Sequence, residues 1–338
     1  MTQKVSLIRG DGIGPEIVEA TVRALEALEV EIEWEEVRAG TGAFQELGTP
    51  LPEETLASIA RNKVVLKGPL ETPVGTGFRS INVAIRKHFD MYANVRPSKI
   101  LPGVKTRFSD SGLDLVIVRE NTEGAYAGIE HAIPPNRAAA ETIILCTRWA
   151  CERIVRYAFE YAKTTGRQKV TLVHKANILK ETHGLFLEVG RSISREYEEI
   201  EFEDLIVDNM AMQMVIRPER FDVIVTTNLF GDILSDLAAG LIGGLGLTPG
   251  ANIGSEASMF EAVHGTAPDI AGKGLANPTA LMRAAGMMLD HMGMTEKARQ
   301  LNGAIDEVLR QGEAVTGDLG GKATTEEYTA ALVEVIKG

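Results

Sequence analysis

Apolar runs of strand length alternate with longer segments of helical periodicity along most of this chain. The clearest strands are expected at residues 4–8, 63–66, 113–118, 169–173 and 221–226. Segments with a helical period lie at residues 15–28, 148–163, 229–241, 278–292 and 324–336. This alternation predicts an α/β fold with a largely parallel sheet, because parallel strands are joined by crossovers that usually form helices on the sheet faces.

Size and charge limit the classes of protein that the sequence can represent. With 338 residues, of which 44% are hydrophobic, the chain can bury the core of one large domain or two medium ones. The formal net charge of -12 disfavours nucleic-acid and anionic-membrane partners, because both select a basic surface. An anionic substrate must therefore be bound by a local group of arginines.

Cysteine usage and the start of the chain bear on location. The cysteines, Cys146 and Cys151, match no metal-ligand spacing, which is typical of a protein from a reducing compartment. The first residues lead directly into an apolar strand and lack the pattern of a signal or transit segment. We therefore expect a cytoplasmic protein.

A glycine-rich turn follows the first strand and precedes the first helix, with the sequence Gly10-Asp-Gly12-Ile-Gly14-Pro15-Glu16. A dinucleotide-binding turn of the Rossmann type occupies the same place in its fold. Its third glycine would stand at position 15, where this chain has proline. The spacing therefore indicates a tight turn with a good helix start rather than a Rossmann fingerprint.

Two carboxylates, Asp232 and Asp236, stand four residues apart just after the strand at 221–226, so that they share one face of a helix. The rest of that helix is apolar nearly all round, which predicts that it is buried. Paired carboxylates there favour a divalent cation, and oxygen ligands suit Mg²⁺ or Mn²⁺. The alternative is a solvated face near the helix N-terminus. A third carboxylate, Asp208, begins another helix and taken alone is only a good N-cap.

Basic residues mark the ends of several expected strands. Arg119 ends the strand at 113–118, Lys175 follows the strand at 169–173, and Arg86 and Arg96 lie in neighbouring segments. Arginine forks bind carboxylates in a bidentate manner, and a lysine beside a metal could act as a base. Ordinary surface salt bridges and a solvated loop lysine are the alternatives.

Together these segments resemble the β-decarboxylating dehydrogenases, the family of isocitrate, 3-isopropylmalate, homoisocitrate and tartrate dehydrogenases. The resemblance covers essentially the whole chain. Its most specific blocks are Val118-Arg-Glu-Asn-Thr-Glu-Gly124, His174-Lys-Ala-Asn177, Asn228-Leu-Phe-Gly-Asp-Ile-Leu-Ser-Asp236 and Val263-His-Gly-Thr-Ala-Pro-Asp-Ile-Ala-Gly272.

The resemblance implies an isocitrate/isopropylmalate dehydrogenase-like α/β fold that is not of the Rossmann type, with two domains around a central cleft. Residues 1–95 and 250–338 are expected to form a large cofactor-binding domain, and residues 96–249 a small central domain with the dimer contact. The extended stretch at 127–147 looks like a clasp between subunits, with a surface hairpin as the alternative. A homodimer, or a multiple of dimers, with shared active sites is expected.

Site residues also follow from the resemblance. Asp208, Asp232 and Asp236 would surround Mg²⁺ or Mn²⁺, with Asp208 and Lys175 reaching in from the neighbouring subunit. Lys175 would remove the hydroxyl proton as hydride passes to the nicotinamide, and Tyr126 would protonate C3 after CO₂ departs. The side chains expected to clamp the substrate carboxylates are those of Arg86, Arg96 and Arg119.

Substrate and cofactor preferences depend on a few further positions. Ser80 and Asn82 resemble the residues that hold the third carboxylate in isocitrate enzymes, whereas an isopropylmalate enzyme would want apolar residues there. Homoisocitrate, one methylene longer, stays a candidate substrate, alone or with isocitrate. Asp269 favours NAD over NADP because a carboxylate accepts hydrogen bonds from ribose hydroxyls and repels an added phosphate. The residues expected at the cofactor are His264, Gly265, Asp269, Ile270 and Asn277.

A non-catalytic regulatory subunit of a heteromeric isocitrate dehydrogenase is a minor alternative. Such a subunit would share the fold without turning over substrate. The full set of expected catalytic and metal-binding residues argues against it, since Tyr126, Lys175, Asp208, Asp232 and Asp236 are all present.

Overall fold

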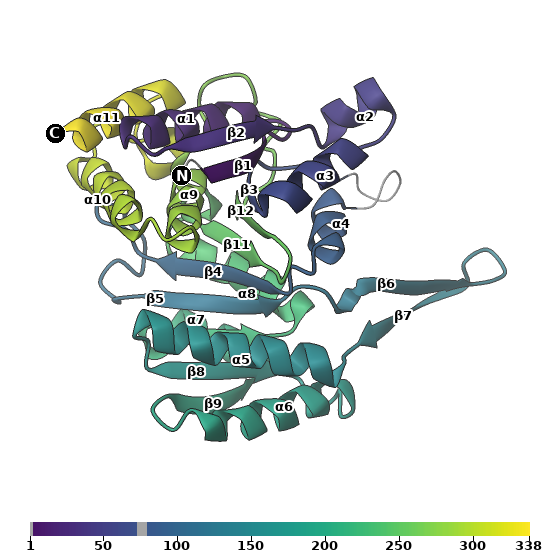
Figure 1. Cartoon of the computed structure of the whole chain (residues 1–338). Coiled ribbons are helices and arrows are strands. Elements are labelled where there is room, and N and C mark those ends of the chain that lie inside the picture. Colours follow the sequence, from purple (N-terminus) through teal and green to yellow (C-terminus); the bar gives the residue numbers. More distant parts are fainter. Residues whose placement is uncertain (1–2, 73–79) are drawn as a thin grey trace. The chain divides into compact units, whose positions relative to one another are not determined.

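The computed structural model describes residues 3–72 and 80–338, which divide into two compact units (Figure 1). Unit 1 comprises the described residues of Met1–Met91, Ile100–Ser109 and Ala239–Gly338, and unit 2 comprises Tyr92–Lys99 and Asp110–Ala238. The chain thus changes unit at 91/92, 99/100, 109/110 and 238/239. The sequence placed changes only at 95/96 and 249/250, so that residues 100–109 were expected in the smaller domain. The assignment of cofactor binding to the larger part and of dimer formation to the smaller part stays a prediction.

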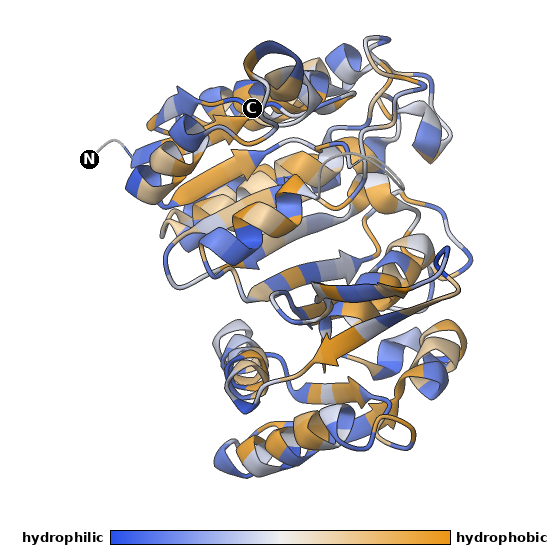
Figure 2. Ribbon diagram, turned by 90° about the vertical axis from the view of Figure 1, so that its right-hand side faces the viewer, coloured by the Kyte–Doolittle hydropathy of each residue, from blue (hydrophilic) through white to orange (hydrophobic). Residues whose placement is uncertain are grey.

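Unit 1 contains five strands, and all neighbours within it except one pair are parallel. Their order is β2 (Ile32–Glu36), β1 (Gln3–Ile8), β3 (Val64–Lys67), β12 (Ser258–Ala262) and β11 (Pro249–Ile253), with β11 antiparallel to β12. Helix α9 (Thr279–His291) packs on β11 and β12 and contacts α1 (Gly14–Ala27) and α10 (Thr295–Gln311), while α11 (Thr325–Lys337) packs on α1 and α10. These helices carry alternating hydrophobic and polar stretches (Figure 2), as expected where only one helix face is buried.

A second hydrophobic layer of unit 1 lies against α3 (Glu53–Asn62) and α4 (Ile81–His88), whereas α2 (Thr41–Leu47) exposes most of its residues. Ile59 from α3 and Ile85 from α4 are fully buried in one cluster with the strand residues Ile8, Val65 and Met259. This packing fixes α4, which carries two of the residues predicted to bind substrate.

Unit 2 also contains five strands in its main sheet. Their order is β4 (Ala93–Lys99), β5 (Asp114–Glu120), β10 (Val223–Thr226), β8 (Lys169–His174) and β9 (Glu201–Ile206), parallel throughout except for the β4–β5 pair. The helices of this unit are α5 (Arg148–Thr165), α6 (Thr182–Ile193), α7 (Val207–Ile216) and the first part of α8 (Asn228–Leu241). Because β5, β8 and β10 are parallel, their carboxyl ends meet at one edge, where sheet ligands commonly bind.

The stretch predicted as an extended arm is a two-stranded hairpin that projects from unit 2 (Figure 1). Strand β6 (Gly124–Ile133) pairs antiparallel with β7 (Ala139–Leu145). Three of its side chains, Ile129, Ile133 and Ile143, are large, hydrophobic and exposed. Its role as a clasp stays a prediction.

The predicted α/β class is confirmed, and every predicted strand and helix is present with ends that shift by no more than two residues. Three details differ. Pro278 is the N-cap of α9 rather than its first residue, and Asp208 lies in the first turn of α7, whose N-cap is Ile206. Helix α8 is not buried all round, because Leu229 and Ile233 are 39% and 58% exposed. In the described part of the chain, no helix is long and apolar enough to cross a membrane.

Candidate active site

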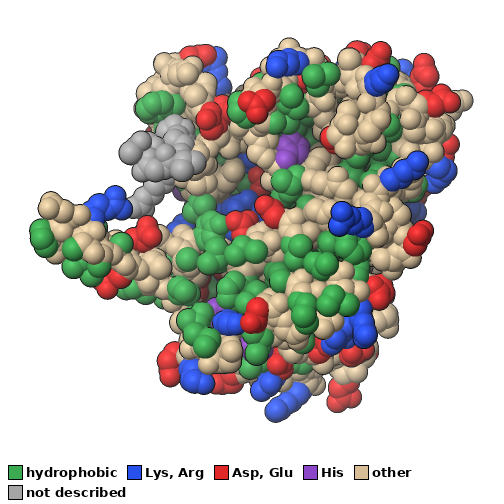
Figure 3. Space-filling view, turned by 180° about the vertical axis from the view of Figure 1, so that it is seen from behind, with side chains coloured by type: hydrophobic (Ala, Val, Ile, Leu, Met, Phe, Trp, Pro, Cys, Tyr) green, Lys and Arg blue, Asp and Glu red, His purple; other side chains and the backbone are tan. Residues whose placement is uncertain are grey.

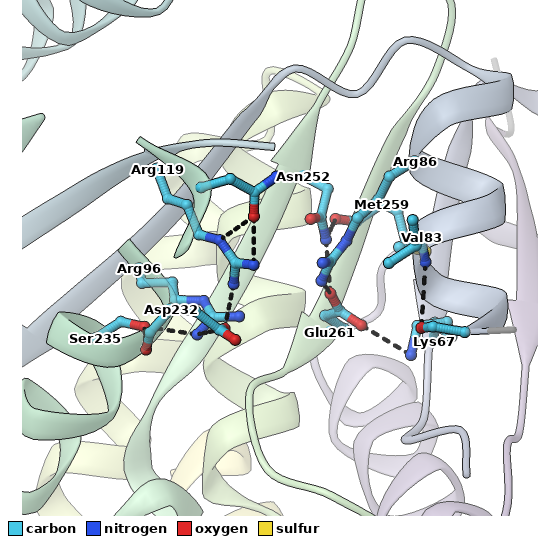
Figure 4. Close-up of polar contacts among 12 residues, drawn as sticks. Lys67, Val83, Arg86, Arg96, Arg119, Asp232, Ser235, Asn252, Met259 and Glu261 are labelled. Carbon is cyan, nitrogen blue, oxygen red and sulfur yellow. Dashed lines mark hydrogen bonds and ion pairs between the residues drawn. The ribbon is translucent and has the colours of Figure 1, made fainter. Parts of the chain in front are cut away.

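Arg119 anchors a polar cluster in unit 2 at the carboxyl end of β5. The side chain is only 1% exposed, and its Nε and Nη2 donate to Oδ1 of Asn228 over 3.1 and 2.6 Å. Its Nη1 donates to Oδ1 of Asp232, one turn further along α8 (Figure 4). Gly231 permits this approach, since a Cβ there would lie 2.5 Å from Cγ of Arg119. The helix thus begins directly over the buried arginine.

Arg96 of β4 brings a second guanidinium to the same carboxylates. Its Nη1 donates to Oγ of Ser235 over 2.6 Å and lies 3.5 Å from Oδ1 of Asp232 and 3.8 Å from Oδ1 of Asp236. Partial burial raises the pKa of Asp236; Arg96 opposes this shift, and the like charge of Asp232 adds to it. Burial and the charge of Asp232 together outweigh the two arginines, and a bound cation would favour the ionised form of Asp236.

Tyr126 of β6 completes this cluster. Its hydroxyl donates to Oδ2 of Asp232 over 2.5 Å, and the guanidinium carbon of Arg119 lies 5.1 Å from the centre of its ring. Burial, followed by the hydrogen bond to Asp232, raises the pKa of Tyr126 above its usual value. The phenol is therefore protonated at neutral pH and can act as a proton donor.

Lys175, at the end of β8, forms a separate pair with Asp208. Lys175 Nζ lies 2.9 Å from Asp208 Oδ2, and this contact lowers the pKa of Asp208. The backbone nitrogen of Lys175 donates to Nδ1 of His183 over 3.1 Å. Within the described residues, no three His, Cys, Asp or Glu side chains gather closely enough to hold a metal ion.

Arg86 belongs to a buried charge cluster in unit 1 that the sequence analysis did not foresee. Its Nη2 donates to Oε1 of Glu261 over 2.8 Å, and Nζ of Lys67 lies 2.8 Å from Oε2 of the same carboxylate (Figure 4). Asn252 Nδ2 also donates to Glu261 Oε1, over 2.7 Å. The Glu261 side chain is 7% exposed, and the two cations outweigh its burial and hold the pKa of the carboxyl far below its usual range.

A sequence signal for this cluster does exist. Lys67 and Glu261 are charged residues at or near the ends of the otherwise apolar strands β3 and β12, and they are paired in the register of the two strands. Strand pairing between segments so far apart in the sequence was not predicted, so neither residue was assigned to the site.

Ser80 and Asn82 lie at the start of α4. Ser80 is the N-cap of the helix, with its Oγ accepting from the backbone nitrogen of Val83 over 3.4 Å. Among the described residues, Oδ1 of Asn82 and Nε of Arg86 are buried without a hydrogen-bond partner. Buried polar atoms of this kind are costly unless a ligand or water pairs with them. The helix therefore presents polar groups that suit a polyanionic ligand.

Unit 1 also contains an open cavity of about 610 Å³ formed by the loops at 264–277 and 317–323 and by the turn before α1. Four of the predicted cofactor residues line it: His264, Gly265, Ile270 and Asn277. Asp269 is exposed and does not line the cavity. Residues that the sequence analysis missed also contribute, namely Ile13, Leu245, Gly246, Leu275, Asp318 and Lys322.

The chemistry of this cavity fits a nucleotide with a heteroaromatic base. Nε2 of His264 is buried and has no hydrogen-bond partner among the described residues, and burial lowers the pKa of this histidine, which favours the neutral ring. Asn277 donates through Nδ2 to Oδ2 of Asp318 over 2.9 Å, which fixes its amide at the cavity wall. Apolar walls with few polar groups are typical of cofactor sites.

Comparison with known proteins identifies similar chains along the full length. A family model described as isocitrate/isopropylmalate dehydrogenase matches residues 4–334. A mitochondrial regulatory subunit of isocitrate dehydrogenase [NAD] from Dictyostelium discoideum is 50% identical over 99% of this chain and 92% of its own length. Isocitrate dehydrogenase [NAD] catalytic subunit 5, mitochondrial, from Arabidopsis thaliana is 50% identical over 97% of this chain and 87% of its own length.

A solved structure agrees with these sequence relatives. The crystal structure of isocitrate dehydrogenase from Methylococcus capsulatus superimposes with a TM-score of 0.97 and 56% sequence identity. The match covers 99% of this chain and 100% of that one. Fold and sequence therefore point to the same set of proteins.

Proposed function

Because the chain belongs to the isocitrate/isopropylmalate dehydrogenase family, we propose that it oxidises and decarboxylates isocitrate to 2-oxoglutarate and CO₂ with NAD as the hydride acceptor. Relatives that share half of its residues carry the name of an NAD-dependent isocitrate dehydrogenase. The observation that carries the proposal is the convergence of Arg96, Arg119 and Tyr126 on Asp232. This arrangement combines carboxylate recognition, a cation site and a proton donor.

The residues of this chain have distinct tasks in the proposed reaction. Arg96 and Arg119 are buried cations that bind substrate carboxylates, and Arg86 does so from α4. Asp232 and Asp236, with Asp208 of a second subunit, would hold Mg²⁺ or Mn²⁺, which when bound favours loss of CO₂ by withdrawing electrons from the oxygen on C2. Tyr126 delivers a proton to C3 through its hydroxyl oxygen.

Lys175 serves as the base that takes the hydroxyl proton in a neighbouring subunit. Its ion pair with Asp208 directs Nζ toward that carboxylate. Asp208 is largely exposed on its own chain, with 69% of its side chain accessible, so that a second chain can reach it. The pair therefore enters a neighbouring active site as one unit.

Substrate preference follows from the polar start of α4. Among the residues that the structure describes, the buried Oδ1 of Asn82 has no hydrogen-bond partner, so the amide can turn either its oxygen or its nitrogen toward a ligand. A third carboxylate can pair with the amide nitrogen, whereas an isopropyl group would leave it unsatisfied. This chemistry favours isocitrate over 3-isopropylmalate, and homoisocitrate remains the second candidate.

The exposed hydrophobic residues of unit 2 support a dimer. Five large hydrophobic side chains of α7 and α8 are between 39% and 60% exposed, namely Met212, Val215, Ile216, Leu229 and Ile233. Figure 3 shows hydrophobic side chains gathered on one face of the molecule. Soluble single chains rarely leave so many large hydrophobic side chains uncovered. We assign this surface, together with the hairpin, to a homodimer. The cytoplasm is the proposed location, on the ground of the cysteine usage of the chain.

Turnover by the purified chain alone tests the proposal. NADH formation is measured with isocitrate, homoisocitrate and 3-isopropylmalate, each with NAD or NADP, and with Mg²⁺, Mn²⁺ or EDTA. The highest kcat/KM is expected for isocitrate with NAD and a metal. A higher kcat/KM for homoisocitrate would overturn the choice of substrate. Activity that survives EDTA would overturn the metal requirement. Absence of any turnover by the chain alone would instead support a regulatory subunit.

A further inference from the structure

The glycine turn at residues 10–16 has a partner in the structure. The backbone nitrogen of Ile13 donates to the carbonyl oxygen of Thr266 over 2.9 Å. Gly12 has a φ of 60°, and a Cβ there would lie 2.1 Å from the same oxygen. Only glycine permits this approach, so the turn is built to lie against the loop that follows β12.

The same loop is held by the side chain of Glu16, in the first turn of α1. Its Oε1 accepts a hydrogen bond from the backbone nitrogen of Gly272, and its Oε2 accepts one from the backbone nitrogen of Gly274 over 3.1 Å. Both glycines have positive φ angles, of 72° and 65°. One carboxylate thus fixes two N–H groups of a glycine-rich segment that has little rigidity of its own.

The segment fixed in this way forms part of the cavity assigned to the cofactor. Ile270 and Leu275, on either side of the two glycines, both line that cavity. Within the segment the backbone forms a short-range turn, in which the nitrogen of Lys273 donates to the carbonyl oxygen of Ile270 over 3.2 Å. The segment also accepts a long-range hydrogen bond, from the backbone nitrogen of Thr325 to the carbonyl oxygen of Gly274 over 2.8 Å. The wall therefore depends on contacts from α1 and α11.

We infer that Glu16 is a positioning residue for the cofactor, which orders the 270–275 wall of the cavity before NAD binds. The inference rests on the proposed function, because it takes the cavity to be the NAD site. A wall that is already ordered binds NAD more tightly, because the apparent affinity is proportional to the fraction of molecules in the binding-competent conformation. The turn that resembles a dinucleotide fingerprint thus supports the cofactor indirectly, through the loop it holds.

A carboxylate is required for this task. It offers an acceptor oxygen to each N–H group, and its charge strengthens both bonds. A glutamine has one acceptor and one NH₂ group, so that one of the two backbone donors would face another donor. Glu16→Gln therefore tests the chemistry with almost no change of shape, and Glu16→Asp keeps the charge but shortens the reach.

The experiment compares these variants with Glu19→Gln as a matched control. Glu19 lies on the same helix, has an exposed side chain, and forms an ion pair with Arg9 over 3.0 Å. NADH binding is titrated by fluorescence without substrate, and hydrogen exchange of the 265–277 amides is followed in the cofactor-free protein. Kinetics give the KM for NAD, the KM for isocitrate and kcat at saturating NAD.

For Glu16→Gln we expect the Kd for NADH and the KM for NAD to rise about tenfold or more, with faster exchange at Gly272 and Gly274. The KM for isocitrate and kcat at saturating NAD should stay within about twofold, because the loop is ordered once NAD is bound. Glu16→Asp should recover part of the affinity, and Glu19→Gln should match the wild type.

The outcomes separate this inference from the proposed function. If the wild type does not bind NADH, the cofactor assignment fails. If the wild type binds NADH but Glu16→Gln and Glu16→Asp bind it equally well, the positioning role is overturned. A parallel loss of kcat, isocitrate affinity and NADH affinity would also overturn it, since that pattern indicates general damage. Should Glu16→Gln not fold, the comparison of Glu16→Asp with the wild type decides by the same criteria.

Discussion

The hydroxyl of Tyr126 donates a hydrogen bond to Oδ2 of Asp232 over 2.5 Å, so that the proposed proton donor and a proposed metal ligand are directly connected. The negative charge on Asp232 helps to keep the phenol protonated by raising its pKa, after the larger effect of burial. A cation on Asp232 would reduce that effect and make the phenol a better acid. If Asp232 holds a metal ion as proposed, metal binding and proton donation would be coupled through this one carboxylate.

Removal of the Tyr126 hydroxyl should reduce protonation at C3. Tyr126→Phe keeps the ring over the Arg119 guanidinium but has no proton to donate. We expect kcat to fall about 10²- to 10⁴-fold, with little change in the KM for isocitrate. Exchange of the C3 hydrogens of 2-oxoglutarate with deuterium, followed by NMR, should slow in parallel. Exchange at the wild-type rate would remove Tyr126 from the proton transfer.

Hybrid dimers test whether Lys175 serves a second subunit. Lys175→Ala and Asp232→Asn are each expected to be folded and inactive. When the two variants are refolded together, each hybrid dimer should have one intact site and recover about half of the wild-type activity. The mixture would stay inactive if Lys175 and Asp232 acted within one chain. Refolded samples of each single variant provide the control.

Asn82 should control the choice between substrates. Asn82→Leu places an apolar side chain where the proposed site binds a third carboxylate, so kcat/KM for isocitrate should fall about 100-fold or more. The value for 3-isopropylmalate should fall less or rise, because its isopropyl group needs no hydrogen bond. Ser80→Ala is a less specific test of substrate choice, because it also removes the cap of α4. An equal loss for both substrates would contradict the specificity role.

His183 should make stability depend on pH. Burial, followed by the charge of His174, lowers its pKa from 6.5 to about 4. Between these values the unfolded chain binds a proton that the folded chain does not, so stability is complete above pH 6.5 and falls by roughly 3 kcal/mol toward pH 4. The free energy of unfolding, measured in urea at pH 7.5 and 5.0, should differ less between the two pH values for His183→Gln than for the wild type. The exposed His131→Gln should leave that difference unchanged.

The fold class was predictable because buried parallel strands and amphipathic helices leave different periods in the sequence. Helix α8 shows the limit of that reasoning. Its nearly continuous hydrophobicity predicted burial on all sides, yet Ile233 is 58% exposed. A hydrophobic pattern predicts that a helix face is buried. It does not distinguish burial in the core of one chain from burial against a partner.

The candidate site was predictable where its residues lie close together in the sequence. Asp232 and Asp236 are separated by one helical turn, so their shared face follows from the helix period alone. The cluster of Lys67, Arg86 and Glu261 instead depends on the pairing of β3 with β12 and on the packing of α4. The sequence shows charged residues near the ends of these strands, but no local pattern shows that the two strands pair. A buried glutamate between two cations therefore escaped notice.

The buried Glu261 cluster leads to the last prediction, which concerns stability. Glu261 lies between Lys67 and Arg86, which are 1% and 7% exposed, and its charge compensates both. Glu261→Gln leaves two buried cations without an anion, which should lower the free energy of unfolding by about 3–5 kcal/mol.

The exposed Glu256→Gln, on the loop before β12, is the control and should change the free energy of unfolding by less than about 0.5 kcal/mol. Adding Lys67→Met to Glu261→Gln should restore part of the loss, because one uncompensated charge is then replaced by an apolar side chain of similar length. Urea unfolding of the four proteins measures these differences, and a Glu261→Gln variant as stable as the Glu256→Gln control would show that the cluster does not depend on the glutamate charge.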